Sequence, residues 1–356
     1  MAFFKLDKEK LNHNYKFLNE LFTKNGIEWG IVTKLLCGNE KFLREVLGLK
    51  PQQVLDSRVQ NLRMIKDIDP DIQTVYIKPP SKRSIPNVVK FADVSFNTEY
   101  DTIKFLSQEA KKQKKLHKII IMIEMGDLRE GVMGDKLVDF YGKVFHLPNI
   151  RIVGIGTNLN CLHGVMPSKD KLILLGLYRQ IVELKFKRDI PWISGGTSVT
   201  LPLLFRKEIP KAINHFRIGE SLFFGKNLFK ERTIKGMKDD MFMLYSEVIE
   251  VGNKPITPFG ELGANLEGEK FKVNEEEYGK EIRRAIIDIG LLDIDPKNLT
   301  PTDKSIEVVG ASSDMLIIDV TNSKKNYRVG DLIKFKVNYL GALNILNSRY
   351  IEKIVD

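Results

Sequence analysis

The sequence predicts an α/β protein: a (β/α)8 TIM-type barrel followed by a C-terminal antiparallel β domain. The chain has 356 residues, more than one typical core holds, so we expect two domains. Strand and helix patterns alternate up to about residue 230, and eight strand–helix units over about 220 residues are typical of a closed parallel barrel. After about residue 232, strand patterns follow one another without long helices between them. We therefore assign 1–232 to the barrel and 233–356 to the β domain.

The barrel half begins with a helix, and eight apolar strand patterns follow it. A helix is expected over 8–24 because four large side chains fall on one face, namely Leu11, Tyr15, Leu18 and Phe22. The first strand is expected over 29–33, followed by a helix over 39–47 that Gly48 stops. Further strands are expected over 54–57, 74–78, 93–97, 118–125, 150–158, 192–195 and 215–218.

The second half shows strand patterns only. Strands are expected over 241–251, 305–309, 315–320 and 331–337. The acidic stretch 274–277 is expected to be a solvated loop, and no internal repeat or low-complexity segment is evident. Strands in such succession favour antiparallel pairing, which short connections can join.

The composition is that of an ordinary soluble globular protein, with 43% hydrophobic and 29% charged residues. No apolar run reaches the ~18 residues of a membrane helix, and the N-terminus does not resemble a secretory signal. The two cysteines, Cys37 and Cys161, make no disulfide framework, so we expect a cytoplasmic protein. The five histidines are scattered without metal-ligand spacing, and we predict no metal site.

The formal net charge is +10 and the sequence pI is about 9.3. Such a charge can indicate nucleic-acid binding. Here the basic residues are dispersed, and the densest run, 110–118, has the pattern of an exposed helix end that leads into a strand. We expect no nucleic-acid partner, and a basic site for an anionic substrate or phosphate is the better interpretation.

Lys34 stands where the first predicted strand ends. An ammonium that is desolvated at a strand end is destabilised, and a lysine with a lowered pKa is a nucleophile able to form a Schiff base with a carbonyl group. A strand-end lysine can also simply extend its ammonium to solvent. The organisation of the other barrel loops decides between these interpretations.

The loops after the seventh and eighth strands contain glycines beside hydroxyl side chains, in the runs 194–198 (SGGTS) and 217–221 (RIGES). Barrels place their chemistry at the carboxyl ends of the strands, and they often bind phosphate in these two loops. Glycines let backbone N–H groups approach phosphate oxygens, and hydroxyl groups add donors. Together with Lys34, the two loops predict a cofactor that carries both a phosphate and an aldehyde.

Seven ordered motifs carry a resemblance that covers nearly the whole chain. They are 32–34 (VTK), 56–62 (DSRVQNL), 125–131 (MGDLREG), 154–159 (GIGTNL), 194–198 (SGGTS), 217–221 (RIGES) and 310–314 (GASSD). With them the chain resembles the alanine racemase-like, fold type III family of pyridoxal phosphate enzymes. Within that family it is most similar to the ornithine racemase branch.

The resemblance implies roles for the barrel residues. Lys34 would hold the cofactor through a Schiff base and remove a proton from one face of the substrate Cα. Ser198 and the backbone of Gly219 and Glu220 would bind the phosphate, and Arg217 would hydrogen-bond the pyridine nitrogen. Because an arginine cannot accept a proton, it would leave that nitrogen unprotonated and the ring a weaker electron sink.

The resemblance also implies a homodimer. Arg129 matches the family arginine near the substrate carboxylate. The triplet Ser312, Ser313 and Asp314 matches a β-domain loop that the partner subunit inserts into the active site. Ser312 and Asp314 are therefore candidate catalytic residues, and Ser313 is a candidate substrate-binding residue.

The chain departs from the family pattern at several positions. The tyrosine that serves as second base falls at Leu291, and a histidine that stacks on the cofactor is replaced by the candidate Asn158. A phosphate-binding tyrosine falls near Gly38. Two carboxylates, Asp293 and Asp295, follow the altered base position and could pair with the distal ammonium of ornithine or lysine.

Each of these candidates also has a purely structural interpretation. Arg129 can form a surface ion pair, and Arg217 can pair with Glu220. Asn158 can cap a local turn, and two carboxylates can be solvated loop residues before a proline, namely Asp293 and Asp295.

The resemblance thus implies an enzyme, an amino-acid racemase that uses pyridoxal 5'-phosphate on ornithine or another dibasic amino acid. The alternatives are an alanine or broad-specificity racemase, or an aldolase, dehydratase or decarboxylase of the same fold type. Aldolases and dehydratases of this type usually bind a metal, and no His/Cys pair near the C-terminus provides for one. A non-catalytic cofactor-binding protein is a further alternative, although such relatives are usually a lone barrel.

Overall fold

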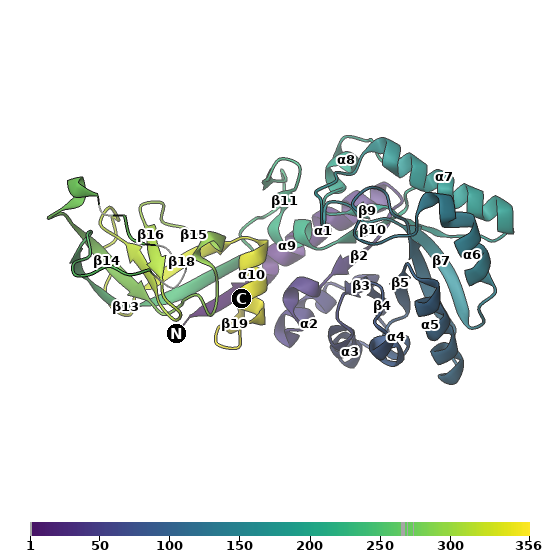
Figure 1. The fold of residues 1–356 in the computed structure, drawn as a ribbon, viewed down its shortest axis with the longest axis horizontal. Coiled ribbons are helices and arrows are strands. Elements are labelled where there is room, and N and C mark those ends of the chain that lie inside the picture. The colour runs from purple at the N-terminus through teal and green to yellow at the C-terminus, as the bar shows by residue number, and fades with distance from the viewer. Residues whose placement is uncertain (1, 265–267, 269, 273) are drawn as a thin grey trace. The chain divides into compact units, whose positions relative to one another are not determined.

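The computed structural model describes residues 2–264, 268, 270–272 and 274–356. The chain forms two compact units, one of Glu9–Asp239 and one of Met1–Lys8 together with Asp240–Asp356 (Figure 1). The predicted boundary at 232/233 therefore lies seven residues early, and the N-terminal strand belongs to the second unit. The segment up to Asp239 stays with the barrel because Asn14 holds Lys238 by two hydrogen bonds of 2.8 Å.

The first unit contains the predicted barrel, and the strands of the barrel are all parallel. In order around the sheet they are β2 (Glu28–Val32), β3 (Gln53–Asp56), β4 (Gln73–Tyr76), β5 (Val94–Asn97), β6 (His117–Met122), β7 (Ile150–Gly156), β8 (Trp192–Ser194), β9 (Gly196–Thr197) and β10 (His215–Ile218). β8 pairs with β7, β9 pairs with β10, and β10 pairs with β2. Only Gly195 separates β8 from β9, so the two together occupy one strand position of the barrel. The barrel closes because β8 pairs with β7 on one side and β9 pairs with β10 on the other.

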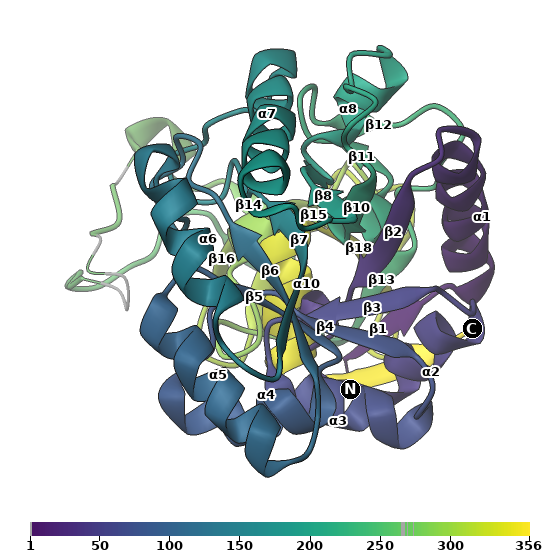
Figure 2. The same cartoon turned by 90° about the vertical axis from the view of Figure 1, so that its right-hand side faces the viewer.

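Helices surround the strands, as Figure 2 shows. They are α1 (Lys8–Lys24), α2 (Glu40–Gly48), α3 (Val59–Ile68), α4 (Ile85–Phe91), α5 (Tyr100–Lys112), α6 (Leu137–Phe145), α7 (Lys169–Phe186), α8 (Leu201–Phe205) and α9 (Glu220–Phe224). α1 has the predicted bounds, and Asn39 caps α2 by accepting a hydrogen bond of 3.1 Å from the N–H of Phe42. Short 3-10 turns add η1 (Lys34–Leu36), η2 (Lys82–Ser84) and η3 (Gly134–Lys136).

The barrel interior is a packed apolar core. Its members are Val32, Leu55, Val75, Val94, Phe96, Ile120, Met122 and Val153, contributed by six of the strands. Gly30 belongs to the same crowded interior, because a Cβ at this position would lie 2.8 Å from the Cβ of Gln53. An interior filled by side chains leaves the chemistry to the strand ends and their loops.

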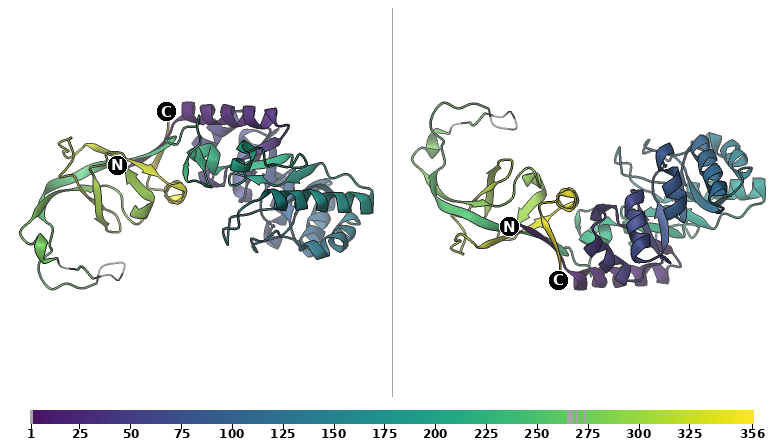
Figure 3. Two further views of the ribbon diagram at one scale, coloured as in Figure 1. Left: turned by 90° about the horizontal axis from the view of Figure 1, so that it is seen from above. Right: turned by 90° about the horizontal axis from the view of Figure 1, so that it is seen from below.

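The second unit is the predicted antiparallel β domain (Figure 3). Its sheet runs β15 (Leu299–Pro301), β18 (Leu332–Val337), β13 (Phe242–Pro255), β14 (Glu281–Ile287), β17 (Leu316–Asp319) and β16 (Glu307–Ala311). β1 (Phe3–Leu6) joins it, antiparallel to β13 and parallel to β19 (Glu352–Val355). The sequence did not predict β1, β14, β15, β19 or the helix α10 (Tyr339–Asn347).

The remaining short elements are the two-stranded pair β11 (Lys226–Asn227) and β12 (Arg232–Thr233) and the turns η4 (Glu275–Glu277) and η5 (Pro296–Asn298). The acidic stretch that was expected to be a loop contains η4. Within the described part of the chain, no helix has both the length and the apolar character that crossing a membrane requires.

Candidate active site at the carboxyl ends of the barrel strands

Lys34 follows β2 by two residues and opens the turn η1. Thr33 anchors this strand end: its N–H donates to the carbonyl of Leu55 at 2.8 Å and its hydroxyl donates to Asp56 at 2.9 Å. Leu35 and Leu36 turn into the core, whereas the Lys34 side chain is exposed. Of the two interpretations that the sequence left open for Lys34, its exposure in this chain fits the one in which the ammonium extends to solvent and stays accessible.

Asp56 holds the strand end that precedes Lys34, through Thr33. It is fully buried and accepts hydrogen bonds from the Thr33 hydroxyl, from the N–H of Arg58 at 2.8 Å and from the amide of Asn61 at 3.1 Å. Burial raises the pKa of Asp56, and these hydrogen bonds partly offset the rise. The carboxyl group thereby ties the end of β2 to the start of α3.

Arg217 points into the barrel from β10. Its Nη1 donates to the carbonyl and the hydroxyl of Ser194 at 2.7 and 2.6 Å, and its Nη2 donates to the carbonyl of Thr157 at 2.7 Å. Its guanidinium also lies over the ring of Phe96, at 5.3 Å from the centroid. Burial lowers the pKa of Arg217 to about 10, so the side chain remains charged at neutral pH. Among the described residues it has no ion pair with Glu220, which removes that structural interpretation.

The two glycine-containing loops meet beside this arginine. The N–H of Ser221 donates to the Ser198 hydroxyl oxygen at 3.1 Å, which joins the loop after β9 to the start of α9. Gly219 precedes α9 without a side-chain cap, and a Cβ there would lie 3.0 Å from the carbonyl oxygen of Val32. Burial raises the pKa of Glu220, and the ammonium groups of Lys226 and Lys34 partly offset that rise. Lys34 thus shares one region with both loops.

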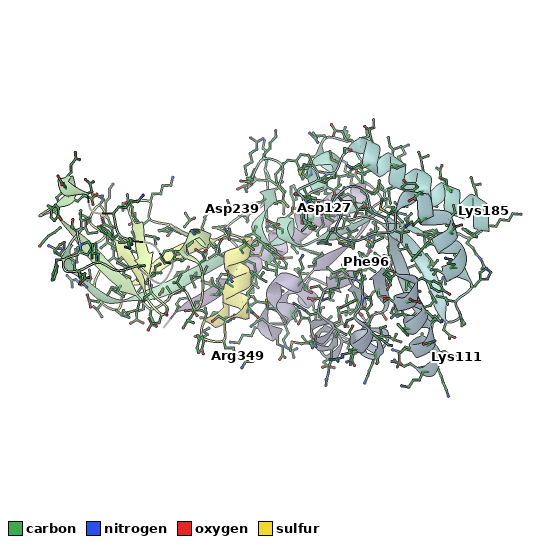
Figure 4. All side chains as sticks on the ribbon, viewed as in Figure 1. Phe96, Lys111, Asp127, Lys185, Asp239 and Arg349 are labelled. Atoms are coloured by element: carbon green, nitrogen blue, oxygen red, sulfur yellow. The ribbon has the colours of Figure 1, made fainter. Side chains whose placement is uncertain are left out.

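Asp127 organises the loops that carry Arg129 and Asn158. The Asp127 side chain, labelled in Figure 4, is 1% exposed. It accepts four backbone N–H groups of the loop after β7, from Cys161, Leu162, His163 and Val165, at 3.0 to 3.3 Å. Burial alone would raise the pKa of Asp127, but these four donors hold it below its usual value. The sequence analysis gave this residue no role, although an aspartate that follows a glycine at a strand end is a possible signal.

Arg129 and Asn158 themselves have local partners. Arg129 forms a two-pronged ion pair with the adjacent Glu130, as its structural interpretation expects. The Asn158 amide lies 3.0 Å from the sulfur of Cys161, within the loop that Asp127 holds. Arg129 and Asn158 therefore belong to two neighbouring loops that one buried carboxylate joins.

The candidates of the β domain also gather in one place. The N–H groups of Leu291 and Leu292 donate to the carbonyls of Ser312 and Ser313 at 3.0 and 2.8 Å. Ser312 donates to Asp314 at 3.3 Å across the turn between β16 and β17. A cavity of about 300 Å³ beside this turn is lined by residues that include Asp288, Leu292, Asp293, Asp314 and Tyr350.

Asp293 and Asp295 line a second cavity of about 350 Å³, together with Asn344 and Asn347. Asp293 accepts a hydrogen bond of 2.9 Å from the hydroxyl of Ser348. Asp295 caps η5 through the N–H of Lys297 at 2.9 Å. Both carboxylates thus have structural partners and also border open space.

The sequence of this chain is similar to those of known racemases. Residues 6–227 match the family model described as "Alanine racemase, N-terminal domain". The chain is 37% identical to ornithine racemase of Acetoanaerobium sticklandii over 98% of both chains, and 31% identical to lysine racemase of Thermotoga maritima over 99% of this chain and 97% of that one.

The fold is that of solved alanine racemases. The enzyme of Bartonella henselae with covalently bound pyridoxal phosphate superposes with a TM-score of 0.74 at 15% identity, over 100% of this chain and 99% of that one. The enzyme of Clostridium difficile 630 gives 0.75 at 12% identity, over 100% and 95%. The matched family model and the two racemases that align over nearly the full length agree, and this chain belongs to the alanine racemase family.

Proposed function

We propose that this chain is a pyridoxal phosphate-dependent racemase that interconverts the L and D forms of a dibasic amino acid, with ornithine as the first candidate. One observation carries the proposal: Lys34, the charged Arg217 and the two glycine-containing loops meet at one end of a barrel of the alanine racemase family. Lys34 is a nucleophile, Arg217 is a fixed cation, and the two loops can bind a phosphate through their backbone N–H and hydroxyl groups.

The residues present fit the cofactor. The Lys34 amine is accessible to an aldehyde. The first turn of α9 has backbone N–H groups with no partner inside the helix, and the Ser198 hydroxyl adjoins them. At Gly219 the chain passes so close to Val32 that a Cβ would lie 3.0 Å from the Val32 carbonyl oxygen, so the close approach of these two strand ends favours glycine here. Arg217 presents a buried positive charge from the barrel floor.

The residues of the chain have separate roles in the proposed reaction. When bound, the cofactor supplies an electron sink for the charge that develops at the substrate Cα. The Nζ of Lys34 would exchange protons with one face of Cα only, taking a proton there from one enantiomer and giving one there to form it, while the second base acts on the opposite face. Arg217 keeps its own protons at neutral pH and so does not protonate the ring nitrogen. We assign Ser198 and the backbone of 219 and 220 to the phosphate, and Arg129 and Asn158 to the wall near the substrate and the ring.

The second base and the side-chain pocket are assigned to the β domain. We propose that the chain acts as a homodimer in which Ser312, Ser313 and Asp314 complete the partner's site, with Asp293 and Asp295 near the distal ammonium of the substrate. The clustering of 291–295 with 312–314 supports this assignment. Because neither Cys37 nor Cys161 forms a disulfide within the described part of the chain, we also propose a reducing, cytoplasmic location.

The test is a panel of enantiopure ornithine, lysine, alanine and serine in deuterated water, with the cofactor added. We expect loss of optical rotation together with deuterium at Cα, fastest for ornithine or lysine, and neither change with Lys34→Ala. Another product, such as an amine or an aldehyde, would instead indicate a decarboxylase or aldolase. No conversion of any of the four by a protein with bound cofactor would refute racemisation of these substrates.

A further inference from the structure

A chain of buried polar side chains runs through the barrel interior and ends at Arg217. His215 lies between Gln53, whose Oε1 is 2.9 Å from His215 Nε2, and Ser194, whose Oγ is 2.7 Å from His215 Nδ1. Ser194 in turn accepts from Arg217 Nη1 at 2.6 Å. Side chains two residues apart on a strand share one face, so His215 lies directly beneath Arg217 on β10. All four residues are at most 5% exposed.

The amide oxygen of Gln53, at one end of this series of side chains, decides where each proton lies. The Gln53 oxygen can only accept, so His215 carries its proton on Nε2 and donates it to Gln53. Nδ1 of the neutral ring is then an acceptor, and the Ser194 hydroxyl must donate to it. The lone pairs of the Ser194 oxygen are left for the Nη1 group of Arg217. Every contact in the chain therefore pairs one donor with one acceptor.

The residues around His215 keep its ring neutral, and this preserves the order of donors and acceptors from Gln53 to Arg217. Burial, and to a smaller extent the charge of Arg217, lower the pKa of His215 to about 3. The indole ring of Trp192 stacks on the imidazole with centroids 4.9 Å apart. A protonated imidazole would carry N–H groups on both ring nitrogens, so the Ser194 hydroxyl would lose its acceptor at Nδ1. The neutral ring keeps that acceptor.

At the Arg217 end of this series of hydrogen bonds, one nitrogen of the guanidinium, Nε, takes no part. Nη1 of Arg217 is occupied by both oxygens of Ser194, and Nη2 donates to Thr157. Within the described ranges, no hydrogen bond uses Nε. A planar guanidinium held at two nitrogens has a single orientation, so the direction of Nε is determined as well.

We propose that Gln53, His215 and Ser194 are positioning residues, which hold Arg217 in one orientation and leave its Nε for the pyridine nitrogen of the cofactor. This inference rests on the proposed function, because it requires a cofactor at this barrel end. Substrate does not contact these three residues. They act only through Arg217, and their loss should affect the chemical step more than substrate binding.

His117 provides a matched control. It is 2% exposed, its Nε2 lies 2.8 Å from the hydroxyl of Ser95, and burial lowers its pKa to about 4. It therefore resembles His215 in burial and in its serine partner. Ser95 bonds to Asn97 and not to Arg217. Replacing His117 should perturb the core to a similar degree without reaching the guanidinium.

The first measurement is the tautomer of His215 by ¹⁵N NMR of the holoenzyme labelled at its five histidines, with the signal assigned by its loss in His215→Gln. We expect a neutral ring protonated at Nε2 throughout the pH range in which the protein is folded. A ring protonated at Nδ1, or one that titrates in this range, would overturn the proton order. This measurement needs no active variant.

The second measurement compares Ser194→Ala and His215→Gln with His117→Gln. For the first two we expect kcat to fall by about tenfold to a hundredfold with little change in KM, as for groups that orient a site residue in other enzymes. The absorption of the bound cofactor should shift in the same sense as in Arg217→Lys, and His117→Gln should leave it unchanged. Ser194→Ala with the spectrum and kcat of the wild type would refute the positioning role.

The two proposals fail in different ways. A wild-type protein that takes up no pyridoxal phosphate would refute the proposed function, and the role toward the ring would fall with it. A wild-type protein that binds cofactor and racemises, with variants of Ser194 and His215 indistinguishable from the His117 control, would refute the positioning role alone.

Discussion

Replacing Asp127 by asparagine is expected to loosen the loop after β7. The carboxylate accepts four backbone N–H groups, two on each oxygen. Asparagine has nearly the same shape, but one of its two terminal atoms is an NH2 donor. Two of the four N–H groups, either those of Cys161 and Leu162 or those of His163 and Val165, would then face a donor.

The expected cost follows from those two bonds. A hydrogen bond to a charged group contributes about 1.5–3 kcal/mol net, and leaving a buried donor without a partner adds to the loss. The carboxylate is buried, but its donors belong to loop residues that are largely exposed, so we take the lower limit for each bond and expect about 3 kcal/mol for the pair. If the loop opens locally, this corresponds to about a hundredfold faster amide exchange.

The assay is hydrogen–deuterium exchange of the peptide that contains 159–166, in Asp127→Asn and in the control Asp135→Asn. Asp135 is an exposed aspartate in η3, on the same connection after β6. We expect faster exchange in the first variant only, together with lower kcat/KM because Asn158 and the neighbouring Arg129 lose their support. Equal exchange in the two variants would refute the idea that Asp127 holds this loop.

The same group predicts a pH dependence. Four backbone donors hold the pKa of Asp127 below its usual value. Its stabilisation is therefore complete above the pKa of the carboxyl in the unfolded chain, and it is lost as the pH falls through the lower pKa of the folded state. Asp127→Asn should remove this part of the acid sensitivity of the 159–166 loop, and an unchanged acid dependence would contradict the assignment.

Three further predictions concern the catalytic assignments. Borohydride should fix the cofactor to the peptide that contains Lys34, and Lys34→Ala should lose essentially all Cα exchange; fixation to another lysine would refute the assignment. Mixed subunits of inactive Lys34→Ala and inactive Asp314→Ala should recover part of the activity through hybrid sites, and no recovery despite demonstrated subunit exchange would indicate that each chain completes its own site. Asp293→Asn or Asp295→Asn should lower kcat/KM for ornithine by the equivalent of about 2–5 kcal/mol and leave alanine nearly unchanged, whereas equal effects on both substrates would leave these carboxylates as structural residues.

Local patterns in the sequence were sufficient for the class of fold. The helix Lys8–Lys24 has the predicted bounds, because an apolar face that repeats every three to four residues is a property of one short segment. The eight barrel strands lie within a few residues of their predicted ranges for the same reason. The alternation of helix and strand followed by strands alone therefore predicted both the barrel and the β domain.

The same local reasoning failed where a partner lies far away in the chain. β1 is only four residues long, and it is a strand because β13 and β19, more than two hundred residues later, pair with it. That pairing also moves the N-terminus into the second unit and shifts the domain boundary. A short segment carries too little periodicity to predict such pairing.

For the site, the sequence by itself determined which residues stand at the strand ends: Lys34 after β2, the glycines and Ser198 after β8 and β9, and Arg217 near the end of β10. Strand ends follow from the pattern, and a barrel gathers them at one rim. Only the tertiary structure decided that the Lys34 side chain is exposed, and that Gln53, His215 and Ser194 form one hydrogen-bonded chain behind Arg217. Three strands separated by up to 162 residues supply that chain, and its protons have a defined order only after barrel closure has excluded water and brought each donor to an acceptor.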